Sequence, residues 1–230
     1  MKGKFPLMNK SRKIATILSV ILLLNSIFLK TKAQNPSYYY LEEPKLFTGG
    51  LVAGVNLCQV DGDKYAGYFK SGVNAGAVLY ARLNEKLSLS MELLFVQKGA
   101  RSNFRQSSSS KIYTIVSQNI NLNYAEIPVL IHLHDKRKSH VGLGLSYAQL
   151  ISANENIRTS PDAAYDPSKY PFLKRDINFI VSGNLHLIKG LYGNIRFQYS
   201  VIPIRKNVDY EFARAHQYNN LWVIRLMYLF

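Results

Sequence analysis

Apolar and polar residues alternate with a period of two in eight separate segments of this chain. The clearest segment runs from Gly72 to Leu83, where every second residue from Val73 onward is apolar. The other seven segments span residues 49–59, 87–95, 122–131, 141–148, 177–187, 194–201 and 222–230. Because successive side chains of a β-strand point to opposite faces, the pattern predicts eight amphipathic strands.

The connections between these segments alternate in length along the chain. Tight connections occur at Asn84–Lys86, around His134–Lys138 and at Lys189–Gly190. The long, polar connections are Asp61–Ser71, Arg101–Asn119, Ala153–Arg175 and Ile202–Asn220. Short turns at one rim and long loops at the other are typical of outer-membrane barrels. The sequence therefore predicts an all-β, eight-stranded antiparallel up-and-down transmembrane β-barrel with both termini in the periplasm.

The fourth segment departs from regular alternation. Leu122 and Tyr124 keep one phase, whereas the apolar residues from Ala125 to Ile131 keep the other. A slip of one residue turns every side chain to the opposite face. Pro128 also lacks the N–H that a regular ladder position requires. We therefore predict a β-bulge between Tyr124 and Pro128 that keeps the apolar face continuous.

The N-terminus has the layout of a secretory signal peptide. A lysine- and arginine-rich start precedes an apolar run from Ile14 to Leu29, and Thr31-Lys32-Ala33 offers small residues for cleavage. The run is shorter than the roughly 20 residues that a spanning helix needs. Met8 is an alternative start, because a basic region follows it as well.

These features divide the chain into three parts. The predicted parts are a signal peptide at 1–33, a periplasmic N-terminal segment at 34–48 and the outer-membrane barrel domain at 49–230.

Removal of the leader changes the charge of the protein. The whole chain has a net charge of +15, but the leader holds seven Lys or Arg, which leaves 22 basic against 14 acidic residues, or +8. The remaining excess is scattered, so nucleic-acid binding is poorly supported and an anionic lipopolysaccharide surface suits the chain better. Cys58 is the single cysteine, which rules out an internal disulfide and a cysteine-based metal site.

The composition of the polar face favours a membrane barrel over a soluble, lipocalin-like one, which remains the alternative fold. That face consists mostly of Gly, Ser, Asn and Ala, which can fill a narrow lumen. We expect the larger polar residues on it to lie inside the barrel: Arg82, Glu92, Asn184, Arg196 and Arg225. The chain closes on Tyr228-Leu229-Phe230, and we interpret Tyr228 and Phe230 as a C-terminal signal for the outer-membrane assembly machinery.

Several stretches of the chain resemble the PorT-like outer-membrane β-barrel family of Gram-negative bacteria. They are Gly49–Gly54, Tyr68–Gly76, Glu92–Ala100, Tyr124–Pro128, Gly142–Gly144 and Asn219–Leu221, of which the Tyr-x-Glu-Ile-Pro stretch is the most specific. The resemblance implies an eight-stranded barrel. Because the founding member is associated with type IX secretion, it also implies secretion-system proteins as partners.

The sequence yields no catalytic residue, no cofactor site and no metal site. A lipid-modifying enzyme would need a Ser–His arrangement near the outer rim, where His216 alone is expected and no motif surrounds it. By strand direction, the other histidines fall toward the periplasmic rim: His132, His134, His140 and His186. The His132-x-His134 spacing can place two ligands on one face, but we interpret the pair as incidental. Glu92 and Glu126 could form an acid–base pair, but interior carboxylates usually pair with arginines.

The remaining alternatives are a pore and a binding scaffold. Eight strands enclose an interior that side chains fill, which disfavours a wide channel. A scaffold would use its long loops, whose aromatic residues are either partner anchors or loop packing: Tyr65, Tyr68, Phe69, Phe104, Tyr165, Tyr170 and Phe172. We therefore expect a non-enzymatic outer-membrane protein with a structural, adhesion or secretion-associated role.

Overall fold

The computed structural model describes residues 45–63, 66–102, 104–108, 110–136, 139–162, 166, 169–206 and 213–230. The predicted signal peptide at 1–33 and the segment that follows it up to residue 44 lie outside these ranges. Within the described ranges, no helix is long and apolar enough to cross a membrane.

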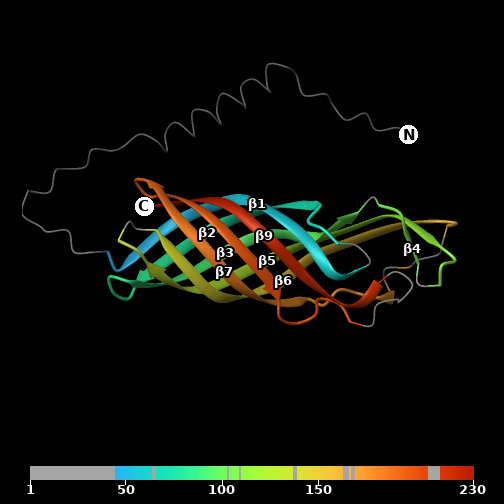
Figure 1. The fold of residues 1–230 in the computed structure, drawn as a ribbon. Coiled ribbons are helices and arrows are strands. Elements are labelled where there is room, and N and C mark those ends of the chain that lie inside the picture. Colours follow the sequence, from blue (N-terminus) through green and yellow to red (C-terminus); the bar gives the residue numbers. More distant parts are fainter. Residues whose placement is uncertain are drawn as a thin grey trace, which may run out of the picture. The chain divides into compact units, whose positions relative to one another are not determined.

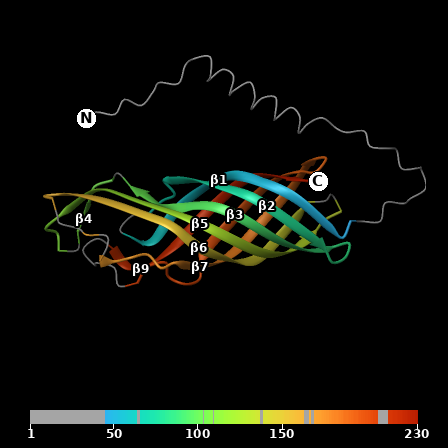
Figure 2. The ribbon, with the colours of Figure 1, turned by 180° about the vertical axis from the view of Figure 1, so that it is seen from behind.

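The described residues form one antiparallel sheet that closes on itself (Figures 1 and 2). Its strands are β1 (Phe47–Asp63), β2 (Lys70–Arg82), β3 (Leu87–Ser102), β4 (Gln106–Ser107), β5 (Thr114–His134), β6 (His140–Ser160), β7 (Arg175–Ile188), β8 (Leu191–Ser200) and β9 (Ala213–Leu229). Each long strand pairs with the long strands before and after it in the chain, so β3 pairs directly with β5. The pairing of β9 with β1 closes the sheet. The predicted eight-stranded up-and-down barrel is confirmed, because β4 only extends a loop hairpin on β5.

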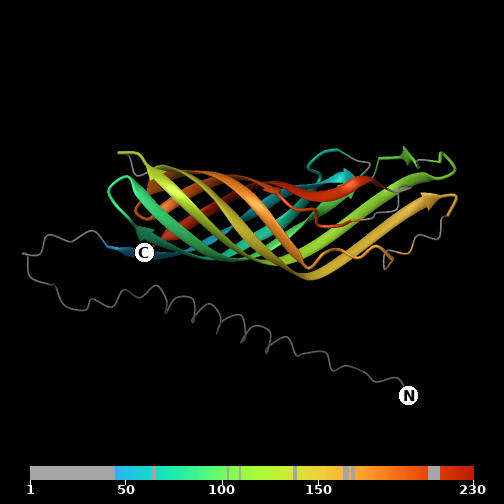
Figure 3. The same ribbon diagram turned by 90° about the horizontal axis from the view of Figure 1, so that it is seen from below.

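The two rims of the barrel differ, as the connection lengths predict. At the rim that we call the turn end, β2–β3, β5–β6 and β7–β8 are joined by tight turns, and Gly190 adopts a φ of 78° that favours glycine. The C-terminus also lies at this rim, where the amide of Phe230 donates to the carbonyl of Gly49 at 3.0 Å. The opposite rim, the loop end, carries the long connections and β4 (Figures 1 and 3).

The outward face of the barrel is a belt of exposed aliphatic and aromatic side chains. On β3 it extends from Leu87 to Phe95, and Leu93 within it is 63% exposed. The polar residues Gln97 and Arg101 occupy the next outward positions toward the loop end. The length of the apolar stretch matches the roughly 9–11 residues that a tilted strand needs to cross a bilayer. A water-soluble barrel would not expose a continuous apolar belt, so this surface argues against the lipocalin-like alternative.

Strands β5 and β6 extend past the belt at the loop end (Figure 3). Each has 21 residues, about twice the length needed to cross a membrane. Parts of the segments predicted as loops are therefore strand: β3 continues to Ser102, β5 begins at Thr114, β6 ends at Ser160 and β9 begins at Ala213. These strand ends were predicted as loops because outward residues are no longer apolar beyond the hydrophobic belt. The alternation of apolar and polar residues therefore ends before the strands do.

The predicted bulge between Tyr124 and Pro128 is wrong. Side chains at even positions of β5 are buried in the lumen from Gln118 to His132 without a change of phase. The irregularity lies on β6 instead, where Ile151 is the extra residue between the partners of Asn123 and Tyr124.

The error arose because apolar residues were assigned to the lipid face. Leu122 and Tyr124 are fully buried inside the barrel. Pro128 keeps the regular phase, and the pairing of β3 with β5 skips Ile127 and Pro128, where the ladder lacks a donor.

The outward belt generates a test by charge insertion. Met91→Arg places a cation near the centre of the belt and should cost about 2–4 kcal/mol of folding free energy in a bilayer, whereas Leu83→Arg at the turn-end rim should cost about 0–1 kcal/mol. Urea titration of both variants in liposomes, read by the fluorescence of the single Trp222, measures the difference. Equal costs for the two variants would contradict the assignment of the outward face to lipid.

Candidate functional site

A cluster of one carboxylate and two guanidinium groups occupies the lumen nearer the turn end. Glu92 on β3 accepts hydrogen bonds from Arg196 on β8 at 2.7 Å and from Arg225 on β9 at 2.8 and 2.9 Å. We call these three residues the arginine cluster. All three side chains are about 1% exposed, so the carboxylate is the counter-ion that keeps two buried cations paired.

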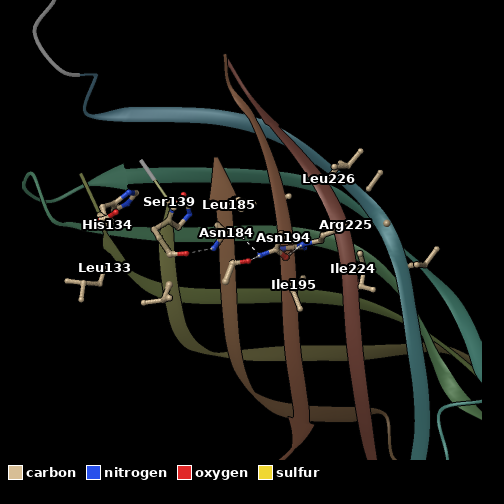
Figure 4. A pocket seen from close by; sticks show the side chains of 18 residues that line it. Leu133, His134, Ser139, Asn184, Leu185, Asn194, Ile195, Ile224, Arg225 and Leu226 are labelled. Atoms are coloured by element: carbon tan, nitrogen blue, oxygen red, sulfur yellow. Dashed lines mark hydrogen bonds between the residues drawn. The ribbon is translucent and has the colours of Figure 1, made fainter. Parts of the chain in front are cut away.

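A row of asparagine amides supports the arginine cluster (Figure 4). The Nε of Arg225 donates to Oδ1 of Asn194 at 2.6 Å, and Nδ2 of Asn194 donates to Oδ1 of Asn184 at 2.6 Å. Asn74 accepts a further bond from Arg225. Gly54 lies against this group, where an added Cβ would collide with the Arg225 side chain.

A second ionic cluster lies closer to the loop end. The ammonium of Lys98 on β3 is 3.0 Å from the carboxylate of Glu126 on β5 and 3.1 Å from that of Asp176 on β7, and all three side chains are buried. We call these three residues the lysine cluster. Gln198 donates to the second oxygen of Glu126 and Ser200 to the second oxygen of Asp176. Asn219 donates to the Asp176 oxygen that contacts Lys98.

The two clusters carry opposite net charges. With every group ionised, the arginine cluster has a net charge of +1 and the lysine cluster a net charge of −1. Strand β8 connects them, because Arg196 and Gln198 are successive inward residues that contact Glu92 and Glu126. The net positive charge of the arginine cluster therefore lies close to the net negative charge of the lysine cluster. Their attraction lowers the free-energy cost of burying both clusters.

Apolar clusters occupy the space around the ionic ones. Toward the turn end, the packed residues are Val52, Val78, Tyr80, Leu94, Val96 and Met227. Toward the loop end, they are Val60, Ala100, Ile120, Leu122, Tyr124, Ala148 and Ile204. Beyond them, the Arg205 guanidinium bonds the Glu155 carboxylate at 2.6 Å and lies 4.1 Å from the centre of the Phe172 ring. Between the two rims the lumen is packed with side chains, as a small barrel requires.

Histidine and tyrosine rings pack together inside the turn end. The His140 ring lies 4.5 Å from that of His134, 5.0 Å from that of His132 and 5.5 Å from that of Tyr192. The hydroxyl of Tyr80 is 3.2 Å from Nε2 of His140. Sequence reasoning placed these histidines at this rim, but the period-two pattern gave no indication that their rings meet across the lumen.

Two serine–histidine hydrogen bonds occur in this ring cluster. Ser88 Oγ lies 2.6 Å from Nε2 of His134, and Ser90 Oγ lies 2.7 Å from Nε2 of His132. A serine hydrolase also needs a carboxylate that orients the imidazole, and no described carboxylate forms an ion pair with His134. In the described part of the chain, no group of three or more acidic, histidine or cysteine side chains is placed to hold a metal ion.

The structure places four of the five proposed interior residues together and one elsewhere. Glu92, Arg196 and Arg225 form the arginine cluster, and Asn184 belongs to its amide row. The interior position expected for Arg82 is wrong: its side chain is exposed at the turn-end rim, because β2 ends there and its Nε donates to the carbonyl of Asn84.

Sequence reasoning missed the lysine cluster. Glu126 pairs with Lys98 rather than with an arginine or with Glu92. The alternation on β3 continues beyond Phe95 and places Lys98 on the inward face. The alternation on β7 likewise extends back to Asp176, which also faces inward.

Other described residues singled out from the sequence lie on the barrel surface or at its loop end. Tyr228 and Phe230 point outward from the turn end and are 53% and 67% exposed. Phe69 and Phe104 pack against each other with ring centres 5.5 Å apart. Tyr65 and Tyr165 lie outside the described residues.

The lipid-facing wall has an apolar groove of about 980 Å³ near the turn end. Ala53, Gly183 and Gly193 take outward positions there between larger aliphatic residues such as Ile195 and Leu226. A Cβ added at Gly183 would meet no atom within 4 Å. The small residues therefore leave a recess in the outer belt at this point.

Comparisons with known proteins agree with this architecture. Residues 33–206 match the family model described as the outer membrane protein beta-barrel domain. No curated protein matches.

Among solved structures, Ail, the attachment invasion locus protein of Yersinia pestis, is 11% identical, with 81% of this chain and 100% of that chain covered and a TM-score of 0.43. The outer membrane protein AlkL in lipid bilayers is 12% identical, with 85% and 97% covered and a TM-score of 0.40.

The arginine cluster generates a test by removal of its counter-ion. Glu92→Gln leaves two buried guanidinium groups without a carboxylate and should lower the free energy of unfolding by about 3–5 kcal/mol. Glu85→Gln, at an exposed turn position, is the matched control and should change it by less than about 0.5 kcal/mol. Denaturant titration in liposomes measures both. The double variant Glu92→Gln with Arg196→Gln should be destabilised by less than the sum of the two single variants. If the losses in the free energy of unfolding are strictly additive, the two side chains are not paired.

Proposed function

The chain belongs to the outer membrane protein beta-barrel domain family, and on this premise we propose that it is a closed, non-enzymatic scaffold of the outer membrane. Its function would then depend on the surface that it presents at the loop end. We further propose that the turn end, with both ends of the barrel domain, faces the periplasm, as short turns do in barrels of this kind.

The observation that carries the proposal is the polar extension of the β5–β6 hairpin beyond the apolar belt. Its outward positions hold amide and hydroxyl side chains in register: Asn119 opposite Asn156, Asn121 opposite Asn154 and Asn123 opposite Ser152. Uncharged amides both donate and accept hydrogen bonds, so this face suits contact with sugar hydroxyls and with polar protein surfaces.

The packed lumen supports a role other than transport. The lysine cluster, the arginine cluster and the apolar residues around them are almost inaccessible to solvent. A solute would have to displace two buried ion clusters, and breaking such pairs costs several kcal/mol each.

The ligands that we propose follow from the position of each surface. The apolar belt contacts membrane lipid, and the basic excess of the chain together with the amide face contacts lipopolysaccharide. Tyr228 and Phe230 lie exposed at the edge of the last strand, where the assembly machinery would recognise them.

A link to secretion is the finer part of the proposal. It rests on the resemblance to the PorT-like family, whose founding member is associated with type IX secretion. In that role the barrel would hold secretion-system proteins at the loop end, and the extended hairpin would supply the contact area.

The experiment that tests the proposal separates assembly from contact. A deletion strain is complemented with the wild-type chain or with a variant carrying Asn119→Ala, Asn121→Ala, Asn154→Ala and Asn156→Ala. We expect the variant to migrate as a folded, heat-modifiable barrel but to release at least about tenfold less secreted protein, as loss of several interface hydrogen bonds implies. Secretion at the wild-type level from both the deletion strain and the variant would contradict the proposal.

A further inference from the structure

The turn end contains a cavity of about 940 Å³ that opens at the rim. Its floor is formed by the ring cluster and its neighbours, including Tyr80, His140 and Tyr192. A volume of this size lies in the range of small-molecule sites. Neither the proposed scaffold role nor the C-terminal assembly signal uses this cavity.

Cations surround the mouth of this cavity from four separate parts of the chain. Lys45 precedes β1, Arg82 ends β2, Lys86 lies in the β2–β3 turn and Lys136 lies in the β5–β6 turn. None of the four forms an ion pair with a described carboxylate. Two acidic side chains, Glu85 and Asp135, also line the cavity, so the charged residues that line it sum to +2.

Hydrogen bonds hold the turns that carry these cations in place. Oδ1 of Asn84 accepts from the amides of Lys86 and Leu87 at 2.8 Å each. The carbonyl of Lys86 accepts from the amide of His134 at 2.8 Å, which ties the β2–β3 turn to the end of β5. The backbone of the β2–β3 turn is therefore ordered before any ligand arrives, and preorganisation lowers the entropic cost of binding.

We propose that this turn-end cavity binds a compact polyanion that carries phosphate groups. A phosphate presents acceptor oxygens in several directions, which fits cations placed on different sides of one mouth better than a planar carboxylate does. The hydroxyl of Tyr192 lines the same cavity and can donate to the ligand. Ser88 and His134 also line it, and they share one hydrogen bond between them. The cavity is larger than one phosphate requires, so a pyrophosphate or a phosphate ester fits it.

Two sources supply this chemistry on the periplasmic side: a free phosphate compound and the headgroup of an anionic phospholipid. That the turn end faces the periplasm rests on the proposed function. Anion binding by the purified barrel does not depend on that orientation. Loss of the secretion phenotype and loss of anion binding are therefore separate outcomes.

The test uses the full barrel folded in phosphatidylcholine liposomes and titrated with inorganic pyrophosphate by calorimetry. The variant Arg82→Gln with Lys86→Gln should bind pyrophosphate at least about tenfold more weakly, because it removes two charge-assisted contacts. The control variant Arg105→Gln with Lys111→Gln makes the same charge change at exposed loop-end positions and should bind within about twofold of wild type. Heat-modifiable migration verifies that both variants fold.

A second arm distinguishes the two sources. Native mass spectrometry counts phosphatidylglycerol adducts on the wild type and on both variants. If only the turn-end variant loses pyrophosphate binding, the ligand is a free phosphate compound. If only the turn-end variant loses phosphatidylglycerol adducts, the ligand is a lipid headgroup. The proposal is overturned if neither probe binds, or if the two variants lose binding equally.

Discussion

A closed barrel of eight strands must fill its own interior, because inward side chains from every strand converge on one narrow axis. This chain meets that constraint with charge as well as with apolar volume. Glu92 holds Arg196 and Arg225, and Lys98 holds two carboxylates. Each cluster joins strands that are distant in the sequence. The ion pairs therefore link strands across the lumen, such as β3 and β8, whereas the backbone ladder links only neighbouring strands.

The same constraint accounts for the small residues on the inward face. Gly54 allows the β9 backbone at Ile224 and Arg225 to approach closely, and Gly142 leaves room for the His132 ring, where an added Cβ would lie 2.5 Å from Nδ1. A larger residue at either position would displace a buried polar group from its partners. Space and charge in the lumen are thus arranged together, and the outer belt is left free to be uniformly apolar.

Fold class and strand count could be predicted from the sequence, because the period-two alternation and the lengths of the connections are both visible in short segments of the chain. Three features could not be predicted in this way. The phase of β5 was misread because Leu122 and Tyr124 are apolar yet face inward, and apolar character alone does not distinguish lipid from a packed lumen. Arg82 follows the inward phase but lies past the end of the packed interior. The meeting of His132, His134 and His140 depends on the curvature of the whole sheet, which no local pattern records.

If the ion clusters and the apolar residues around them close the lumen, the barrel should not conduct ions. Single-channel recording of the wild-type barrel in a planar bilayer measures this conductance. We expect no stepwise current once insertion has been verified by protease protection. Steady ohmic steps from the folded protein would show an open aqueous path past the arginine and lysine clusters and would contradict the claim.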